Sequence, residues 1–256
     1  MRHAGKAIST ILALAAAYSC GGAAPPAPSP APATRTIALS GNLAFGNVLA
    51  GSTTESTLTI SNTGSASVTV TGLTAPSGYS ASWTNGVIPS GGQQSVTISF
   101  LPTAAGNYNG AIVVLADQTP GSTTIAVSGG AFPDLNGVWV GIEKSPGFNA
   151  CNITWTVSGQ TGQEFSGNWQ NSGFSGQCLH GGSLTGTVSV GGAISNLKFG
   201  VAVGVGLQCG PVPVAGGLFE GPVTGSSLQV QGAETLLCGF PLAEVARSVS
   251  MSMTKQ

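Results

Sequence analysis

Cysteine is the residue type in this chain that is best placed to do chemistry. Four of the five cysteines lie beyond residue 150, and the fifth stands alone near the N-terminus. In an exported protein an even set of cysteines predicts disulfides, and four cysteines allow three connectivities. A metal site with four thiolate ligands is the alternative, but the chain contains no Cys-x-x-Cys pair to form one. We expect two disulfides and favour pairing between sequence neighbours: Cys151 with Cys178 and Cys209 with Cys238.

The other reactive side chains form no recognisable catalytic set. His180 is the only histidine after residue 19, and the Gly-x-Ser-x-Gly, Walker A and His-x-x-x-His patterns are absent. We therefore expect a protein that is not an enzyme and that holds no cofactor and no metal. A glycosidase needs only two carboxylates about 5 to 10 Å apart, so it stays open as an alternative. The glutamates that could supply them show no local pairing: Glu143, Glu164, Glu220, Glu234 and Glu244.

The N-terminus of the chain has the pattern of an export signal. Three basic residues, Arg2, His3 and Lys6, precede an apolar stretch at residues 8–17. This stretch is shorter than the ~18 to 20 residues that a membrane-spanning helix needs. We therefore expect residues 1–19 to be removed during export rather than retained in a membrane.

A lone cysteine follows that apolar stretch. Residues 17–22, with the sequence Ala-Tyr-Ser-Cys-Gly-Gly, resemble the lipobox of bacterial lipoproteins, in which the cysteine is acylated and becomes the new N-terminus. The resemblance implies that Cys20 carries a lipid. The family usually has Leu where this chain has Ala17, and cleavage by ordinary signal peptidase after Ala17 or Ser19 is the alternative. The Pro- and Ala-rich residues 21–34 are too poor in large apolar groups to fold and predict an extended tether.

Charge excludes one class of function. Of seven Lys and Arg residues, Arg2 and Lys6 lie in the expected signal, which leaves five basic against eight acidic residues. Nucleic-acid binding needs clustered basic side chains, so we expect no nucleic-acid partner. Only 6% of the residues are charged, and the abundance of Gly, Ser, Thr and Asn is typical of short strands joined by tight turns.

The first domain, expected at residues 35–130, has strict alternation of apolar and polar residues. Residues 57–60, 68–71 and 96–100 each place apolar side chains on one face with a period of two, as half-buried strands require. Turn sequences separate these runs at intervals typical of a sandwich. We expect about seven strands between residues 37 and 128, packed as two antiparallel sheets.

Short motifs span nearly the whole of this domain. They are Phe-Gly-Asn-Val at 45–48, Ser-Asn-Thr-Gly at 61–64, Pro-Ser-Gly-Gly at 89–92, Phe-Leu-Pro-Thr at 100–103, Gly-Asn-Tyr-Asn-Gly at 106–110 and Val-Ser-Gly at 127–129. With these motifs the domain resembles the immunoglobulin-like ASH (Hydin-type) domains that are called choice-of-anchor D in bacterial surface proteins. The resemblance implies a scaffold or interaction module without shared chemistry, so the fold alone indicates little about function.

The second domain, expected at residues 134–256, differs in composition and contains three of the four tryptophans. Eight short strands in hairpin order predict an up-and-down antiparallel barrel, because closure removes exposed sheet edges. An open antiparallel sandwich is the alternative. The strands are expected at residues 137–143, 152–158, 164–170, 183–190, 194–201, 214–220, 227–234 and 245–254.

One pair of residues supports closure of the barrel. The segment Gly137-Val138-Trp139 resembles the Gly-x-Trp signature of the calycin superfamily, in which a basic residue of the last strand packs over the tryptophan. The resemblance implies that Trp139 seals one end of the barrel and that Arg247 covers it. Such a cation–π contact contributes about 0.5 to 2 kcal/mol, depending on burial.

These features together predict an exported protein that a lipid anchors to the bacterial cell envelope, at the outer membrane or the surface, and that acts as a non-catalytic structural or binding module. Its expected partners are the membrane, through the lipid, and an envelope protein or carbohydrate. The alternative is that the second domain binds a small apolar ligand or a carbohydrate. Gly-rich strands would leave room for a small apolar ligand if the barrel were hollow, whereas an interior filled by Trp155 and its neighbours would reject that alternative.

Overall fold

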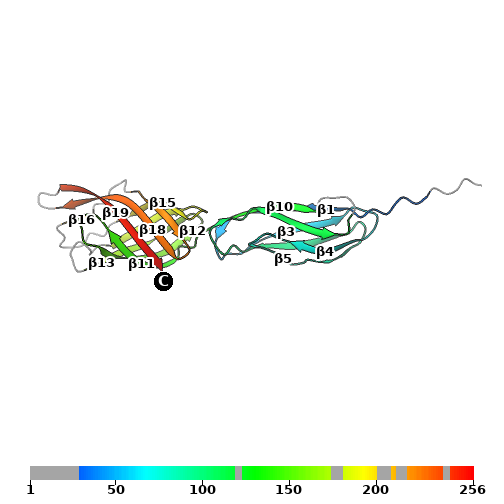
Figure 1. The fold of residues 1–256 in the computed structure, drawn as a ribbon, viewed down its shortest axis with the longest axis horizontal. Coiled ribbons are helices and arrows are strands. Elements are labelled where there is room, and N and C mark those ends of the chain that lie inside the picture. The colour runs from blue at the N-terminus through cyan, green and yellow to red at the C-terminus, as the bar shows by residue number, and fades with distance from the viewer. Residues whose placement is uncertain (1–28, 119–122, 174–180, 201–208, 212–217, 239–242) are drawn as a thin grey trace, which may run out of the picture. The chain divides into compact units, whose positions relative to one another are not determined.

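The computed structural model describes residues 29–118, 123–173, 181–200, 209–211, 218–238 and 243–256, without the side chains of 209–211, 234–238 and 243–245. These residues form strands and turns (Figure 1). None of the described segments is a helix long and apolar enough to cross a bilayer. Cys20 and the expected signal lie outside the described residues, as do Cys178 and His180.

The N-terminal part of the fold is a sandwich of two sheets. One sheet has the strand order β1-β3-β7-β5, and the other has the order β2-β10-β9-β4-β6, with β8 paired to β10. Its strands are β1 (Ile37–Ser40), β2 (Ala44–Leu49), β3 (Thr54–Asn62), β4 (Val68–Thr74), β5 (Tyr79–Ala81), β6 (Gly86–Ile88), β7 (Gln93–Phe100), β8 (Gly106–Asn107), β9 (Gly110–Ala116) and β10 (Thr124–Phe132).

The predicted sandwich is confirmed, with two differences in detail. The sandwich has ten strands instead of about seven, because short segments such as β8 pair with their longer neighbours. Strands β2 and β10 are parallel, whereas antiparallel pairing was expected throughout. Parallel neighbours cannot be joined by a tight turn, and the strands between β2 and β10 in the sequence provide the long connection.

The sandwich core follows the predicted alternation. The apolar residues of β3 and β7, including Leu58, Val96 and Phe100, are fully buried between the sheets. Phe100 stacks on Tyr79 with ring centroids 4.7 Å apart, and Phe45 packs 5.6 Å from the Phe100 ring. The aromatic residues of the Phe-Gly-Asn-Val and Phe-Leu-Pro-Thr motifs therefore meet in the core.

Asn62 has a structural role at the end of β3. Its side chain is buried, and its Nδ2 donates hydrogen bonds to the carbonyl oxygens of Ala66 and Ile88, both at 2.9 Å. Its Oδ1 accepts a hydrogen bond from the Gly64 N–H at 2.9 Å. A Cβ at Gly64 would lie 2.3 Å from the carbonyl oxygen of Thr34, so the turn requires glycine there. The Ser-Asn-Thr-Gly motif thus satisfies backbone groups that the turn would otherwise leave unpaired.

The C-terminal part of the fold is a closed barrel of eight strands in consecutive antiparallel order. Each strand pairs with the next, and the last strand pairs back onto the first through β11 and β19. The strands are β11 (Gly137–Lys144), β12 (Cys151–Thr161), β13 (Glu164–Ser172), β14 (Gly181–Val188), β15 (Ala193–Phe199), β17 (Phe219–Thr224), β18 (Ser227–Cys238) and β19 (Ala243–Lys255).

The predicted up-and-down barrel is therefore confirmed. Its register is continuous across the closing pair, from Trp139 opposite Lys255 to Lys144 opposite Ser250. Figure 1 shows β18 in orange and β19 in red running side by side, and these two strands share the longest run of paired residues in the barrel. A short extra strand, β16 (Cys209–Pro211), pairs with the end of β18.

Side chains fill the described interior of the barrel. Apolar residues of all eight strands form one buried cluster, which includes Trp139, Trp155 and Trp169. Glycines at inward positions do not leave free space in this interior. A Cβ on Gly186 would lie 2.6 Å from the Phe165 ring, and one on Gly232 would lie 2.7 Å from the Phe219 ring. Aromatic rings of neighbouring strands thus occupy the space that these glycines leave.

Candidate functional site

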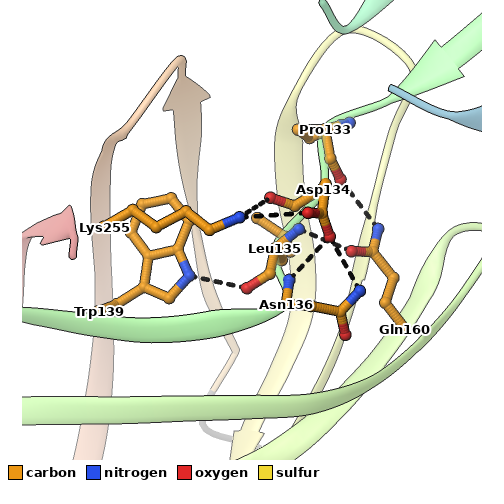
Figure 2. A network of polar contacts seen from close by, with 7 residues as sticks. All are labelled: Pro133, Asp134, Leu135, Asn136, Trp139, Gln160 and Lys255. Atoms are coloured by element: carbon orange, nitrogen blue, oxygen red, sulfur yellow. Dashed lines mark hydrogen bonds and ion pairs between the residues drawn. The ribbon is translucent and has the colours of Figure 1, made fainter. Parts of the chain in front are cut away.

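Trp139 lies at one end of the barrel, near the start of β11. It is fully buried, and its Nε1 donates a hydrogen bond to the Leu135 carbonyl oxygen at 2.8 Å. Gln160 fastens the same segment from β12, because its Oε1 accepts from the Leu135 N–H at 2.7 Å and its Nε2 donates to the Pro133 carbonyl at 2.9 Å. Figure 2 shows these side chains converging on residues 133–136, which close this end of the barrel.

The basic residue over Trp139 is Lys255, and the predicted pairing with Arg247 is wrong. The Lys255 Nζ lies 5.9 Å from the centroid of the Trp139 ring, and the Lys255 side chain runs along the indole in Figure 2. The reason is register, since Trp139 is directly opposite Lys255 on the closing strand. Arg247 lies eight residues earlier, about 26 Å away along an extended strand.

Asp134 completes the network at this end. The Lys255 Nζ donates to the Asp134 carbonyl oxygen at 2.8 Å and lies 3.3 Å from its Oδ2. Asp134 Oδ1 accepts from the backbone and side-chain nitrogens of Asn136 at 3.0 and 2.9 Å. Partial burial by itself would raise the pKa of the Asp134 carboxyl, but the hydrogen bonds from Asn136 and the charge of Lys255 outweigh it and hold this pKa below its ordinary value.

Arg247 instead forms a buried ion pair at the other end of the barrel strands. Its Nη2 lies 2.8 Å from Glu143 Oε1, and the two side chains are only 10% and 5% exposed. Asn171 Nδ2 donates to Glu143 Oε2 at 3.2 Å, and the Phe148 ring lies under the guanidinium at 5.1 Å from its centroid. The alternation along β11 and β13 placed Glu143 and Asn171 on the inward faces, and this signal could have identified them from the sequence.

The three barrel tryptophans form one row across neighbouring strands. Trp139 is opposite Trp155, and Trp155 is opposite Trp169. Trp169 Nε1 donates to the Gly200 carbonyl at 3.0 Å, whereas Trp155 Nε1 is buried without a partner among the described residues. Phe199 packs against both Trp155 and Trp169, at 5.7 and 5.3 Å between ring centroids. Among the described residues, the interior is filled by side chains and has no space that supports binding of an apolar ligand inside the barrel.

Two predicted disulfides concern residues that are only partly described. Cys151 is buried and disulfide-bonded, and every other cysteine lies where no side chain is described. The backbone register places Cys209 of β16 directly opposite Cys238 of β18. Directly opposed residues of an antiparallel pair have Cα atoms about 4.5 to 5.5 Å apart, which is within the range that a disulfide spans.

The candidate carboxylates whose side chains the structure describes do not converge. Glu143 forms an ion pair with Arg247. Glu164 and Glu220 are exposed on the outer faces of β13 and β17. The side chains of Glu234 and Glu244 are outside the described residues. Within the part of the chain that the structure describes, no three His, Cys, Asp or Glu side chains are close enough to hold a metal ion.

An outward-facing hollow was not predicted from the sequence. It has a volume of about 940 Å³ and lies over strands β15, β17, β18, β19 and β11. Its lining combines apolar residues with the polar side chains of Lys144, Glu220, Gln229, Gln231 and Ser250. These residues come from four strands, of which β17, β18 and β19 are consecutive in the sequence. Closure of the barrel brings Lys144 of β11 beside them.

Comparison with known proteins assigns the first domain. Residues 36–130 match the HYDIN/CFA65/VesB-like, Ig-like domain family. No curated protein matches the chain. Among solved structures, the chain is similar to the ASH/PapD-like domain of human CEP192 (PapD-like domain 7), with 22% identity, 46% of this chain and 98% of that chain covered, and a TM-score of 0.35. It is also similar to the YadV chaperone, with 13% identity, 82% and 98% covered, and a TM-score of 0.26. Residues 36–130 are an Ig-like domain of the ASH/Hydin type.

Proposed function

We propose that this protein is held at the bacterial cell envelope by a lipid on Cys20 and acts there as a non-catalytic structural and binding module. The observation that carries the proposal is the position of the ASH/Hydin-type domain, residues 36–130. This domain follows directly on a signal-like segment, a lipobox-like cysteine and a Pro- and Ala-rich tether. Ig-like domains of this type are scaffolds, so the sequence order is that of an anchor, a spacer and a presented module.

The barrel fits the same role. Its interior is filled with apolar side chains, while the hollow on its outer face is lined by polar, charged and apolar residues. A barrel with a filled interior binds partners on its outer surface rather than inside the barrel. The two disulfides proposed for the barrel, Cys151 with Cys178 and Cys209 with Cys238, are those expected of a domain exposed to an oxidising compartment.

Metabolic labelling with a palmitate analogue tests the anchor. The wild-type protein should incorporate the label and enter the detergent phase on Triton X-114 partitioning. The Cys20→Ser variant should do neither. Ser19→Ala is the matched control, because a small residue before the cysteine is kept, and it should label like the wild type.

The outcome separates the proposal from its main alternative. Equal labelling of wild type and Cys20→Ser would reject the lipid anchor. An unlabelled wild-type protein released in soluble form, with a new N-terminus after Ala17 or Ser19 by mass spectrometry, would show cleavage by ordinary signal peptidase. In the anchored case, pulling down envelope components with the purified mature chain should recover a partner through the described domains.

A further inference from the structure

The hollow on the outer face of the barrel has an ordered lining. Strand register places two rows of outward side chains across it. In the first row, Lys144 of β11 is opposite Ser250 of β19, Ser250 is opposite Gln231 of β18, and Gln231 is opposite Glu220 of β17. This row therefore begins with a cation, ends with an anion, and has an hydroxyl and a primary amide between them.

The second row is less polar and lies beside the first. Ile142 is opposite Ser252, and Ser252 is opposite Gln229. The row ends at Pro222 and Ala193, which pair with each other. The apolar groups of Ile142, Pro222 and Ala193 give the hollow a partly apolar side along the polar row.

Gly221 allows two strands under the hollow to approach each other closely. Gly221 stands between Glu220 and Pro222 on β17, and a Cβ there would lie 1.9 Å from the Gln229 carbonyl oxygen. The two strands therefore approach each other too closely at this point for any side chain. The volume of about 940 Å³ is within the range of sites that hold small organic ligands.

The polar side chains of the first row are available to a ligand. Within the described part of the chain, the side chains of Lys144, Ser250, Gln231 and Glu220 make no hydrogen bond or ion pair, and all four residues are exposed. Neighbouring strands lie about 4.8 Å apart, so the three strand-to-strand steps from Lys144 to Glu220 span about 14 Å. The row thus offers a positive and a negative group at a defined separation.

We propose that this hollow binds a short extended peptide of about four residues, with its terminal carboxylate at Lys144 and its terminal ammonium at Glu220. Four extended residues span about 13 to 14 Å, which matches the separation of the two charged groups. Gln231, Gln229 and the two serines supply both donors and acceptors, as the amide groups of a peptide backbone require. The proposal rests on the proposed function as a binding module and names the ligand class of one of its surfaces.

Charge distinguishes this ligand from others. A neutral oligosaccharide would leave both charged groups without a partner, and none of the described residues that line the hollow is an aromatic one on which a sugar ring could stack. An anionic polymer would meet Glu220 at one end. Only a ligand with opposite charges at its two ends satisfies both Lys144 and Glu220.

Binding is tested by NMR titration of the purified mature chain with three probes. These are tetra-alanine with free termini, the same peptide N-acetylated and C-amidated, and cellotetraose. The free peptide should shift the amide signals of Gln229, Gln231 and Ser250. The capped peptide should bind at least about fivefold more weakly, since it loses both surface ion pairs.

Variants identify the charged contacts. Lys144→Met and Glu220→Gln should each weaken binding of the free peptide by about fivefold. The combined Lys144→Glu and Glu220→Lys exchange should restore it, because the peptide can bind in the reverse direction. Lys198→Met and Glu164→Gln, which change the same residue types on other outer strands, are the matched controls and should bind like the wild type.

Equal affinity for the capped peptide, binding of cellotetraose in its place, or no shifts with any probe would overturn the proposal. So would an exchange variant that folds but binds no better than the single variants. None of these results bears on labelling at Cys20, so failure of the peptide site is distinguishable from failure of the envelope anchor.

Discussion

Arg247 Nη2 and Glu143 Oε1 lie 2.8 Å apart inside the barrel, and they join its first strand to its last. The two side chains are 10% and 5% exposed, so neither charge could remain in this position without the other or a comparable partner. Glu143 lies near the end of the paired run, opposite Met251, and the ion pair joins it to Arg247, which lies three residues beyond Ser250, the last residue of β19 in that run. The ion pair therefore fastens the closing pair of strands near the point where their backbone hydrogen bonds end.

Removing one member of this pair should be strongly destabilising. We expect Arg247→Met or Glu143→Gln alone to lower the free energy of unfolding of the barrel by about 3 kcal/mol or more, because each change breaks a buried ion pair while one of its charges stays buried. The double variant should recover most of the loss. Urea unfolding followed by tryptophan fluorescence measures this, since three of the four tryptophans are in the barrel. If the double variant lost as much free energy of unfolding as the two single variants added together, the two side chains would not be coupled.

Asn62 should be essential to the sandwich although it is a turn residue. Asn62→Ala removes the partners of two carbonyl oxygens and one N–H, with the Asn62 side chain itself buried. We expect a loss of about 2 to 4 kcal/mol, since each unpaired buried group costs about 1 to 3 kcal/mol and water can reach some of them. Asn85→Ala is the control, because Asn85 bonds only the neighbouring Thr84 hydroxyl. Similar melting temperatures for both variants would refute the role of Asn62.

The end of the barrel near Trp139 should contribute an acid-sensitive part of the stability. The pKa of Asp134 is lowered in the folded protein, so its contribution is present above the unfolded pKa of about 4 and is lost as the pH falls through the folded value. Asp134→Asn should therefore flatten the dependence of the melting temperature on pH between about pH 5 and pH 2. Glu164→Gln controls for a general change of charge. An unchanged pH profile in Asp134→Asn would argue against the network of Figure 2.

A methyl group at Gly186 should destabilise the barrel because it clashes with the Phe165 ring, and shortening the side chain at residue 165 should relieve this clash. Gly186→Ala places a Cβ 2.6 Å from the Phe165 ring, and we expect overpacking to cost about 1 to 3 kcal/mol. Combining it with Phe165→Leu, which shortens the facing side chain, should cost less than the sum of the two single changes. Strict additivity in thermal unfolding would show that the two side chains do not compete for the same space.

The barrel should depend on oxidation while the sandwich does not. Every cysteine except Cys20 lies beyond residue 150, and Cys151 is disulfide-bonded. Loss of two bridges removes several kcal/mol, which is comparable with the total stability of a domain. Limited proteolysis with mass mapping should show that a thiol reductant exposes residues 134–256 before residues 35–130. Unchanged resistance of the barrel, or free thiols before reduction, would reject the proposed disulfides.

Much of the fold could be predicted from the sequence because its signals are local. Alternation with a period of two, as at Leu58 and Ile60 in β3 or Ile153, Trp155 and Val157 in β12, determines which side chains face a core. Turn residues mark where strands end. These local patterns were sufficient for the sandwich, for a barrel of eight consecutive strands and for the burial of Trp139 and Trp155.

Local patterns thus predicted the order of the barrel strands, many of the side chains that point inward and the burial of Trp139. They did not predict which basic residue covers that tryptophan. Arg247 and Lys255 both lie on the last strand, and the pairing register of β11 and β19 decides which of them is opposite Trp139. Alternation with a period of two cannot predict this, because a shift of the register by two residues keeps every side chain on the same face. The same applies to the hollow, because Lys144 and Glu220 lie in one row of side chains only when the barrel is closed. Local alternation selects a face, whereas neighbours on that face are selected by long-range pairing.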